Sequence, residues 1–201
     1  MRVDTRRERE IQELKNLIIK HSWKIIKEEG WQSLSLRKIA DAIEYSVPVI
    51  YKHFENKEAI LQHFSKEGYE LLYKKLKADL GKLTLGSIQL RSIANSYWEF
   101  AANNTQHYRI MFGLGIPNCQ TINSSEEMSK TSKLILTAIT STLIEANNAS
   151  ADIYLKLRTF WSIVHGFIAI ELLSNHNLSS QPSACMVDAI EGFIYTLEHK
   201  N

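Results

Sequence analysis

Apolar residues recur at spacings of three and four along most of the chain, which is the period of a helix that buries one face. The first run predicts a helix over residues 6–29, and Gly30 follows it as a glycine that can end a helix. The apolar stripe of this helix comprises Ile11, Leu14, Ile18 and Ile25. Only three prolines and eight glycines are present, too few for the many turns of an all-β fold, so we expect an all-α protein.

Two much shorter apolar segments come next, over residues 36–43 and 47–53. Ser35 and Ser46 precede them and are candidate N-caps, while Pro48 falls in the first turn, where its missing N–H costs little. Helices this short are marginal in isolation, so neighbouring long helices must support them.

The second supporting helix is predicted over residues 57–79, with Asn56 as its N-cap. Two short helices joined by a tight turn form a helix-turn-helix, in which the second helix enters the DNA major groove. A groove about 12 Å wide admits a protruding helix of two turns. The sequence therefore predicts a DNA-binding domain at residues 1–60.

A second domain, residues 61–201, is predicted to be helical and rich in large apolar side chains, which makes about nine helices in the whole chain. Gly81 and Gly86 interrupt the pattern at its start. The later helices are expected at about 86–103, 105–113, 125–147, 151–175 and 183–199.

Composition adds little to this picture. The formal net charge is +2, and the excess lies in residues 1–60, with 12 Lys and Arg against 10 Asp and Glu. Cys119 and Cys185 stand far apart with no metal-binding spacing, so we expect no disulfide, metal or cofactor, and a reducing cytoplasm. The most apolar segment is interrupted by His165 and Glu171, so no membrane span is expected.

The segments "EEGWQSLSLRKIADAIEYS" and "VPVIYKHFENKEAIL" resemble the TetR family of bacterial transcriptional regulators. The resemblance covers residues 11–61 and includes the Tyr-x-His-Phe of the recognition helix and the lysine that opens the fourth helix. One departure is Glu44, where many members carry glycine in the turn. A non-glycine residue there is expected to adopt a positive φ.

The resemblance implies which residues lie at the DNA. Arg37 is expected to grip guanine O6 and N7 with its guanidinium, and Val47, Pro48 and Val49 to read only thymine methyl groups or DNA shape. The positioning contacts to phosphates are expected from the helix starts and basic edge, which are Ser35, Ser46, Tyr51, Lys52, His53 and Lys57. The alternative for Tyr51 and His53 is that they only brace the small domain; Phe54 is assigned to the core.

In the second domain, "LRSIANSYWEFAANNTQHYRIMFG" and "FWSIVHGFIAIELL" resemble the C-terminal domain of a TetR subgroup named for a Trp-His-Gly signature. Trp161, His165 and Gly166 are the residues that carry it here. The resemblance implies a domain that senses a ligand and dimerises, without identifying the ligand.

The helix over 151–175 is apolar on two sides, and so needs two partners. One side can face its own domain and the other a second subunit, where Gly166 and Ala169 permit close approach. Together with the last helix it could form a four-helix bundle across a two-fold axis. The expected interface residues are Ile163, Gly166, Ile170, Leu173, Ile190, Phe193 and Ile194.

Aromatic residues at helical spacing, with a few polar groups among them, suggest a small-molecule site. The candidate ligand contacts are Tyr97, Trp98, Tyr108, Met111, Phe112, Trp161 and His165. The alternative is that these side chains only fill the core, with His165 as a hydrogen-bonded core residue.

Enzymatic function is not expected, because the chain carries no P-loop, HExxH, GxSxG or Gly-rich dinucleotide turn. The only reactive pair worth weighing is Cys119 with His107. We therefore expect a homodimeric repressor that binds a double-stranded palindromic operator and is released by a small, largely apolar effector. The alternative is a dimer that binds DNA or another protein independently of any ligand.

Overall fold

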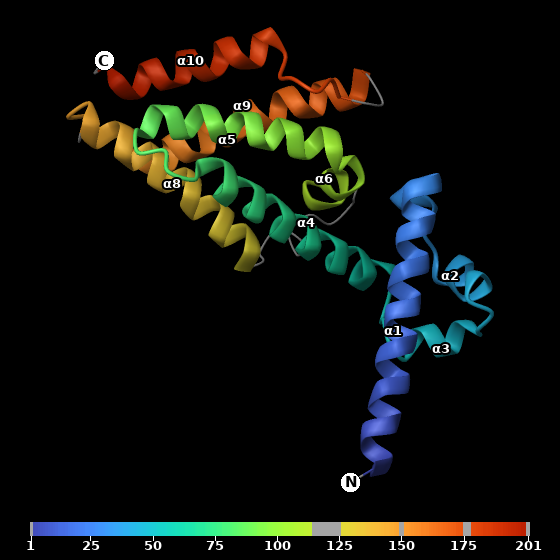
Figure 1. The fold of residues 1–201 in the computed structure, drawn as a ribbon. Helices are drawn as coiled ribbons and strands as arrows, with labels where there is room; N and C mark the ends of the chain where they lie inside the picture. Colours follow the sequence, from blue (N-terminus) through green and yellow to red (C-terminus); the bar gives the residue numbers. More distant parts are fainter. Residues whose placement is uncertain (1, 114–125, 149–150, 175–177, 200–201) are drawn as a thin grey trace. The chain divides into compact units, whose positions relative to one another are not determined.

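In a computed structural model of the chain, the structure describes residues 2–113, 126–148, 151–174 and 178–199. Within these ranges it consists of helices and turns without a strand, so the predicted all-α class is confirmed (Figure 1). The helices are α1 Arg2–Glu29, η1 Trp31–Ser33 (a 3-10 turn), α2 Leu36–Ala42, α3 Val47–Tyr51, α4 Lys57–Leu80, α5 Gly86–Asn103, α6 Thr105–Met111, α8 Glu126–Glu145, α9 Ile153–Ser174 and α10 Ala184–Glu198.

The chain divides into two compact units, residues 1–65 and residues 66–201. The division falls inside α4, five residues after the predicted boundary at residue 60. Because α4 carries apolar residues for both cores, no linker separates the units in sequence, and the helical pattern alone could not show where one core ends.

Unit 1 has a small core of its own, built around α1, α2, α3 and the start of α4. Gly30 ends α1 with a φ of 83° and donates its N–H to the Ile26 carbonyl at 3.0 Å, as expected of a glycine that ends a helix. The fully buried apolar residues of this core are Ile18, Ile26, Ile39, Ile50, Ile60 and Leu61. This core holds the two short helices in place.

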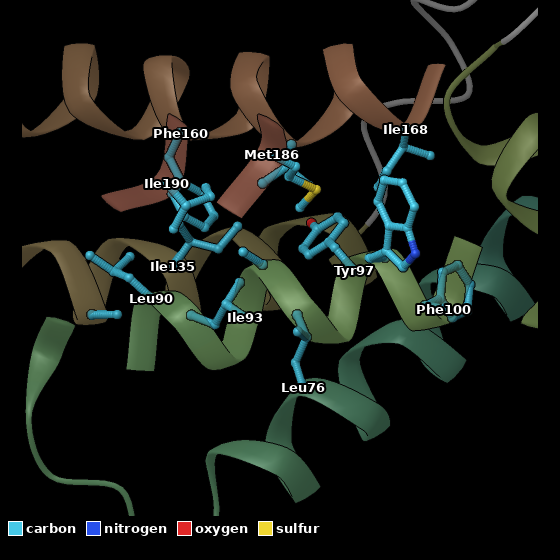
Figure 2. Close-up of a cluster of buried hydrophobic side chains, with 14 of the residues drawn as sticks. Leu76, Leu90, Ile93, Tyr97, Phe100, Ile135, Phe160, Ile168, Met186 and Ile190 are labelled. Atoms are coloured by element: carbon cyan, nitrogen blue, oxygen red, sulfur yellow. The ribbon is translucent and has the colours of Figure 1, made fainter. Parts of the chain in front are cut away.

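Unit 2 is a layered bundle in which α5 and α8 pack closely and α9 and α10 lie against them (Figure 1). Figure 2 shows Leu90 and Ile93 of α5 meeting Ile135 of α8, Phe160 of α9 and Ile190 of α10. All five side chains are buried. One contiguous core therefore draws on helices from most of the unit.

Gly86 explains why α5 and α8 can approach so closely. A Cβ atom there would lie 2.4 Å from the Thr142 backbone nitrogen, so only glycine fits. The Gly86 N–H donates to both carboxylate oxygens of Glu145, at 3.1 and 3.2 Å, which caps the N-terminus of α5 with a negative charge. Gly86 is the first residue of α5, so the start of the helix predicted over 86–103 is confirmed.

The two faces of α9 differ in burial. Phe160, Val164 and Ile168 are fully buried in unit 2, whereas Ile170 and Leu173 are 61% and 81% exposed. Among the described residues, α9 is also the one helix whose length and apolar composition would suffice to cross a membrane, a test that the core helix of a soluble protein can pass as well. Only 22% of that apolar window is fully buried, while other apolar residues of α9 are partly buried against the core of unit 2.

Candidate functional sites

The helix-turn-helix predicted from the sequence is present as α2, a tight turn and α3 (Figure 1). The Ser35 hydroxyl accepts the Lys38 N–H at 3.2 Å and caps α2, as predicted. Glu44 in the turn has a φ of 58°, the positive value expected where a glycine is replaced. The shape of the turn is therefore kept at the cost of a strained non-glycine residue.

The start and the end of α3 differ from the prediction. Ser46 occupies the N-cap position, but its side chain makes no capping hydrogen bond, and only its carbonyl accepts the Val49 N–H, at 2.9 Å. The helix ends at Tyr51 rather than at His53, whose N–H bonds to the Ile50 carbonyl in a turn. A single helical turn thus presents the candidate recognition surface.

All ten residues implied at the DNA are at least partly accessible. Arg37, Ser46, Pro48, Tyr51 and Lys52 are exposed, and Ser35, Val47, Val49, His53 and Lys57 are partly exposed. Tyr51 is 58% exposed, so its hydroxyl is accessible to a phosphate. Phe54 is buried, as predicted.

The charges around these helices distinguish one basic residue from another. The Lys38 ammonium lies 2.6 Å from the Glu29 carboxylate, so its charge is partly neutralised. No ion pair involves Arg37 within the part of the chain that the structure describes. Lys57 lies over the Trp31 ring at 5.9 Å from the centroid, next to the start of α4, where Asn56 caps the Ala59 N–H at 2.8 Å. A cation and a helix N-terminus together favour a phosphate.

The aromatic residues predicted as ligand contacts gather around the His165 ring in unit 2. The ring centroids of Phe112, Tyr97, Tyr108 and Trp161 lie 4.1, 5.5, 5.8 and 5.9 Å from it. We call these five residues together with Tyr69, which lies 5.6 Å from Phe112, the aromatic cluster. Tyr69 was not predicted as a ligand contact, because the apolar residues of α4 around it follow the pattern of an ordinary core helix.

Hydrogen bonds join the polar atoms of the aromatic cluster in pairs. The Tyr108 hydroxyl lies 2.5 Å from His165 Nδ1, and Trp161 Nε1 donates to the Tyr97 hydroxyl at 3.0 Å. Burial raises the pKa of Tyr69, Tyr97 and Tyr108, and lowers the pKa of His165 to about 3. The cluster is therefore neutral at physiological pH.

Two predicted ligand contacts lie apart from the His165 ring. Trp98 is buried and donates its Nε1–H to the Ser179 carbonyl at 2.9 Å, which ties α5 to the segment before α10. Met111 is buried against Gly68, so its thioether fills the space between α6 and α4. Both have the role of core residues in this conformation.

Two surface pockets lie elsewhere in unit 2. One, of about 240 Å³, is lined by residues of α8 and the start of α9, among them Leu143, Ile144 and Ile153. The other, of about 140 Å³, lies between α5 and α10 beside Arg91 and Glu191, which form a salt bridge of 2.6 Å. Neither is lined by a residue of the aromatic cluster.

The predicted dimer interface is partly corrected by the structure. Ile190, Phe193 and Ile194 of α10 are buried in the core of unit 2, so these side chains are unavailable to a second subunit. Their stripe faces the chain's own α9, where Phe193 lies 5.6 Å from Phe160. The outward residues of α10 include Val187 and Tyr195, 46% and 61% exposed, which were missed.

Three of the four predicted interface residues on α9 lie on its uncovered side, whereas Ile163 is partly buried against the core of unit 2. Gly166, Ile170 and Leu173 are exposed, and Ile163 is partly exposed. A Cβ atom at Gly166 would meet no atom within 4 Å, and the same is true of Gly192 on α10, which was also missed. Six of the exposed positions of α9 follow one helical stripe, which is Leu155, Thr159, Ser162, Gly166, Ile170 and Leu173, and Tyr154, Arg158 and Ser174 are exposed as well.

Of the reactive pair weighed from the sequence, Cys119 lies outside the described residues. His107 is buried, with Nε2 3.5 Å from the Glu67 carboxylate on α4. Among the described residues, no cluster of His, Cys, Asp and Glu is arranged to hold a metal ion.

Comparisons with known proteins match both units. Residues 18–70 match the family described as "Bacterial regulatory proteins, tetR family", and residues 90–193 match "Tetracyclin repressor-like, C-terminal domain". A comparison with curated proteins found no match.

Solved structures share the fold at low sequence identity. The fatty acid degradation regulator FadR from Bacillus halodurans is 18% identical, with a TM-score of 0.70 over 92% of this chain and 97% of that one. FadR from Bacillus subtilis, in complex with stearoyl-CoA, is 18% identical, with a TM-score of 0.66 over 90% and 96%. The TetR family regulator PfmR from Thermus thermophilus is 16% identical, with a TM-score of 0.60 over 92% and 98%.

Proposed function

The chain belongs to the TetR family of bacterial transcriptional regulators, and on that basis we propose that it is a homodimeric repressor released from a palindromic operator by a small, largely apolar effector. The family and the structural neighbours are regulators and not enzymes. A cytoplasmic location follows from binding chromosomal DNA in a bacterium.

The observation that supports DNA binding best is the exposed surface of α2 and α3. Arg37, Tyr51 and Lys52 are exposed above a buried layer that contains Ile39 and Ile50. Arg37 can form two hydrogen bonds to guanine, whereas Tyr51 and Lys52 can bind phosphates. A two-fold dimer would place two such surfaces about 34 Å apart, on successive turns of the major groove.

Dimerisation is supported by the uncovered stripe of α9. A second copy would cover Ile170 and Leu173 and could approach closely at Gly166, where a side chain is absent and space is open. The outward residues of α10, including Val187, would extend the same interface. This arrangement also accounts for an apolar helix that its own chain covers on one side only.

Effector binding is supported by the aromatic cluster and by a structural neighbour that binds an acyl-CoA. Release requires that the effector bind better to a conformation whose recognition helices are wrongly spaced, because equal affinity for both conformations shifts nothing. The subgroup with the Trp-His-Gly signature stays a prediction that rests on Trp161, His165 and Gly166.

The experiment that tests this function maps the DNA protected by the purified protein around its own gene. We expect a near-palindromic footprint, and a compound that weakens it should itself bind the operator complex more weakly by the same factor. A second candidate, a dimer that binds DNA independently of ligand, is favoured by the buried state of Tyr97 and Tyr108. Unchanged operator affinity across a metabolite screen would support that candidate, and absence of any footprint would contradict both.

A further inference from the structure

The Phe112 ring lies at the centre of the aromatic cluster. Its centroid is 4.1 Å from that of His165, 4.6 Å from Tyr108, 5.6 Å from Tyr69 and 6.5 Å from Tyr97. These neighbours come from α9, α6, α4 and α5. Phe112 itself belongs to no helix: it follows α6 as its C-cap residue, with φ −103° and ψ 10°, and it is partly exposed. One ring at a helix end thus fills a space enclosed by four helices.

Two polar atoms of the cluster are buried and have no hydrogen-bond partner among the residues that the structure describes. These are the Tyr69 hydroxyl oxygen and His165 Nε2. Leaving a buried polar group unpaired costs about 1–3 kcal/mol, so native proteins tolerate few of them without a functional reason. Here two occur in one cluster, on two rings that both lie against the Phe112 ring.

Hydrogen bonding indicates which proton His165 carries. Tyr108 has His165 Nδ1 as its partner, and a phenol hydroxyl satisfies its own hydrogen only by donating it. If the Tyr108 hydroxyl donates to Nδ1, the neutral imidazole carries its proton on Nε2. Because burial lowers the pKa of His165 to about 3, the ring stays in this neutral form at physiological pH. The Tyr69 hydroxyl and the Nε2–H of His165 are therefore two unused donors.

We propose that Phe112 occupies the effector site in this conformation, and that the effector is an uncharged flat aromatic compound with an oxygen acceptor, such as a carbonyl, that pairs with His165 Nε2–H and the Tyr69 hydroxyl. This inference rests on the proposed function, because it specifies the class of effector that unit 2 senses. The displaced phenyl ring defines the size and flatness of the space. The surrounding rings would stack on an aromatic ligand as they do on Phe112.

The absence of charge in the cluster sets the polarity of the ligand. A carboxylate there would be buried among three tyrosines, a tryptophan and a neutral histidine, without a counter-charge from the cluster. A carbonyl oxygen needs only the two donors that are free. Since Phe112 must leave first, the apparent affinity of the wild-type protein is reduced by the fraction of molecules in which the site is open.

The test removes Phe112 and compares two probes of nearly equal shape, acetophenone and ethylbenzene, by calorimetry with the full-length protein. Phe112→Ala should bind acetophenone at least tenfold more tightly than the wild type does, and about tenfold more tightly than it binds ethylbenzene. Adding Tyr69→Phe to Phe112→Ala should reduce this preference severalfold and leave ethylbenzene binding unchanged. Adding His165→Phe to Phe112→Ala, which removes the other donor, should likewise reduce the preference for acetophenone severalfold.

Phe160→Ala is the matched control, because Phe160 is a fully buried phenylalanine of the same unit that packs on Phe193, outside the aromatic cluster. Its cavity should accept both probes without preference. If Phe112→Ala does not fold, Phe112→Leu gives the same comparison with a smaller cavity. Equal affinity for the two probes in the Phe112 variant, or a preference that survives both donor substitutions, would overturn the inference.

Failure of this proposed site can be distinguished from failure of the proposed repressor function. A wild-type protein that fails to protect any DNA, while the Phe112 variant still prefers acetophenone, would contradict the repressor and leave the site standing. Operator release by a compound such as an acyl-CoA, unaffected by Tyr69→Phe, would leave the repressor standing and overturn this site.

Discussion

At the scale of single residues, the basic side chains on the surface of unit 1 have different neighbours. Lys38 is paired with Glu29, Lys57 lies over Trp31 at the start of α4, and Arg37 is exposed without an ion pair among the described residues. Of these, only Arg37 has both a free guanidinium and a position at the start of α2. It is therefore the best candidate for reading a base.

Arg37→Ala should weaken operator binding by about 1–3 kcal/mol and relax the preference at one base pair of each half-site, because alanine cannot form the paired hydrogen bonds to guanine. Lys57→Ala should weaken binding to all duplexes alike and reduce the slope of log affinity against log salt by about 0.9 for each phosphate that is no longer neutralised. Binding to an operator and to a scrambled duplex at several salt concentrations measures both. Lys77→Ala, an exposed charge in unit 2, serves as the control, and an Arg37 variant that keeps its sequence preference would show that Arg37 binds a phosphate only.

The buried neutral state of His165 makes stability depend on pH. In the unfolded chain its imidazole takes a proton below about pH 6.5, whereas in the folded chain its pKa is about 3. The free energy of unfolding should therefore fall as the pH decreases from about 6.5 toward 3, by at most about 1.4 kcal/mol per pH unit. In the wild type, His165 should lower the free energy of unfolding by about 2 kcal/mol between pH 7 and pH 5. His165→Gln, whose amide oxygen can still accept from Tyr108, should lack this contribution. Urea unfolding at both pH values and at one protein concentration checks this, and identical pH profiles for the two proteins would contradict it.

At the scale of elements, unit 1 shows how two helices of seven and five residues persist. Neither could form alone, so the buried contacts of Ile39 and Ile50 with the core stabilise them. The Ser35 side chain caps and so stabilises α2, whereas the Ser46 side chain makes no capping hydrogen bond to α3. The two serines occupy equivalent positions in the sequence but contribute differently to the stability of the helix that each precedes.

Ser35→Ala should lower the free energy of unfolding of unit 1 by about 1 kcal/mol, because the Lys38 N–H loses its acceptor. Ser46→Ala should change the free energy of unfolding by only about a few tenths of a kcal/mol, since the Ser46 side chain makes no capping hydrogen bond. Operator affinity can still fall in the Ser46 variant, because Ser46 is exposed beside the recognition surface. Chemical unfolding followed by circular dichroism distinguishes the two, and equal destabilisation would show that Ser46 caps α3 in solution.

At the scale of the whole molecule, the proposed dimer depends on the uncovered stripe of α9. An apolar helix face with residues as exposed as Leu173 is unusual for a monomer in water. We propose a second copy as the partner, since each chain would offer the same stripe across a two-fold axis.

Gly166→Leu should raise the dissociation constant of the dimer at least tenfold, because a side chain would separate the two copies of α9. The variant should still fold, since a Cβ there meets no atom within 4 Å in its own chain. Gly166→Ala, which adds one methyl group, should stay dimeric. Sedimentation velocity over a range of concentrations tests this, and a Leu variant that associates like the wild type would remove Gly166 from the interface.

The all-α class, the order of the helices and most of their ends follow from the amino-acid sequence alone, because a 3.6-residue period, caps such as Asn56 and the glycine at position 30 act locally. The partner that each apolar stripe meets emerged only from the folded chain. The α10 residues Ile190 and Phe193 turned out to face their own core, and Phe112 turned out to fill the space among four helices. Periodicity identifies the face of a helix that avoids water, whereas the surface that covers this face depends on residues distant in sequence.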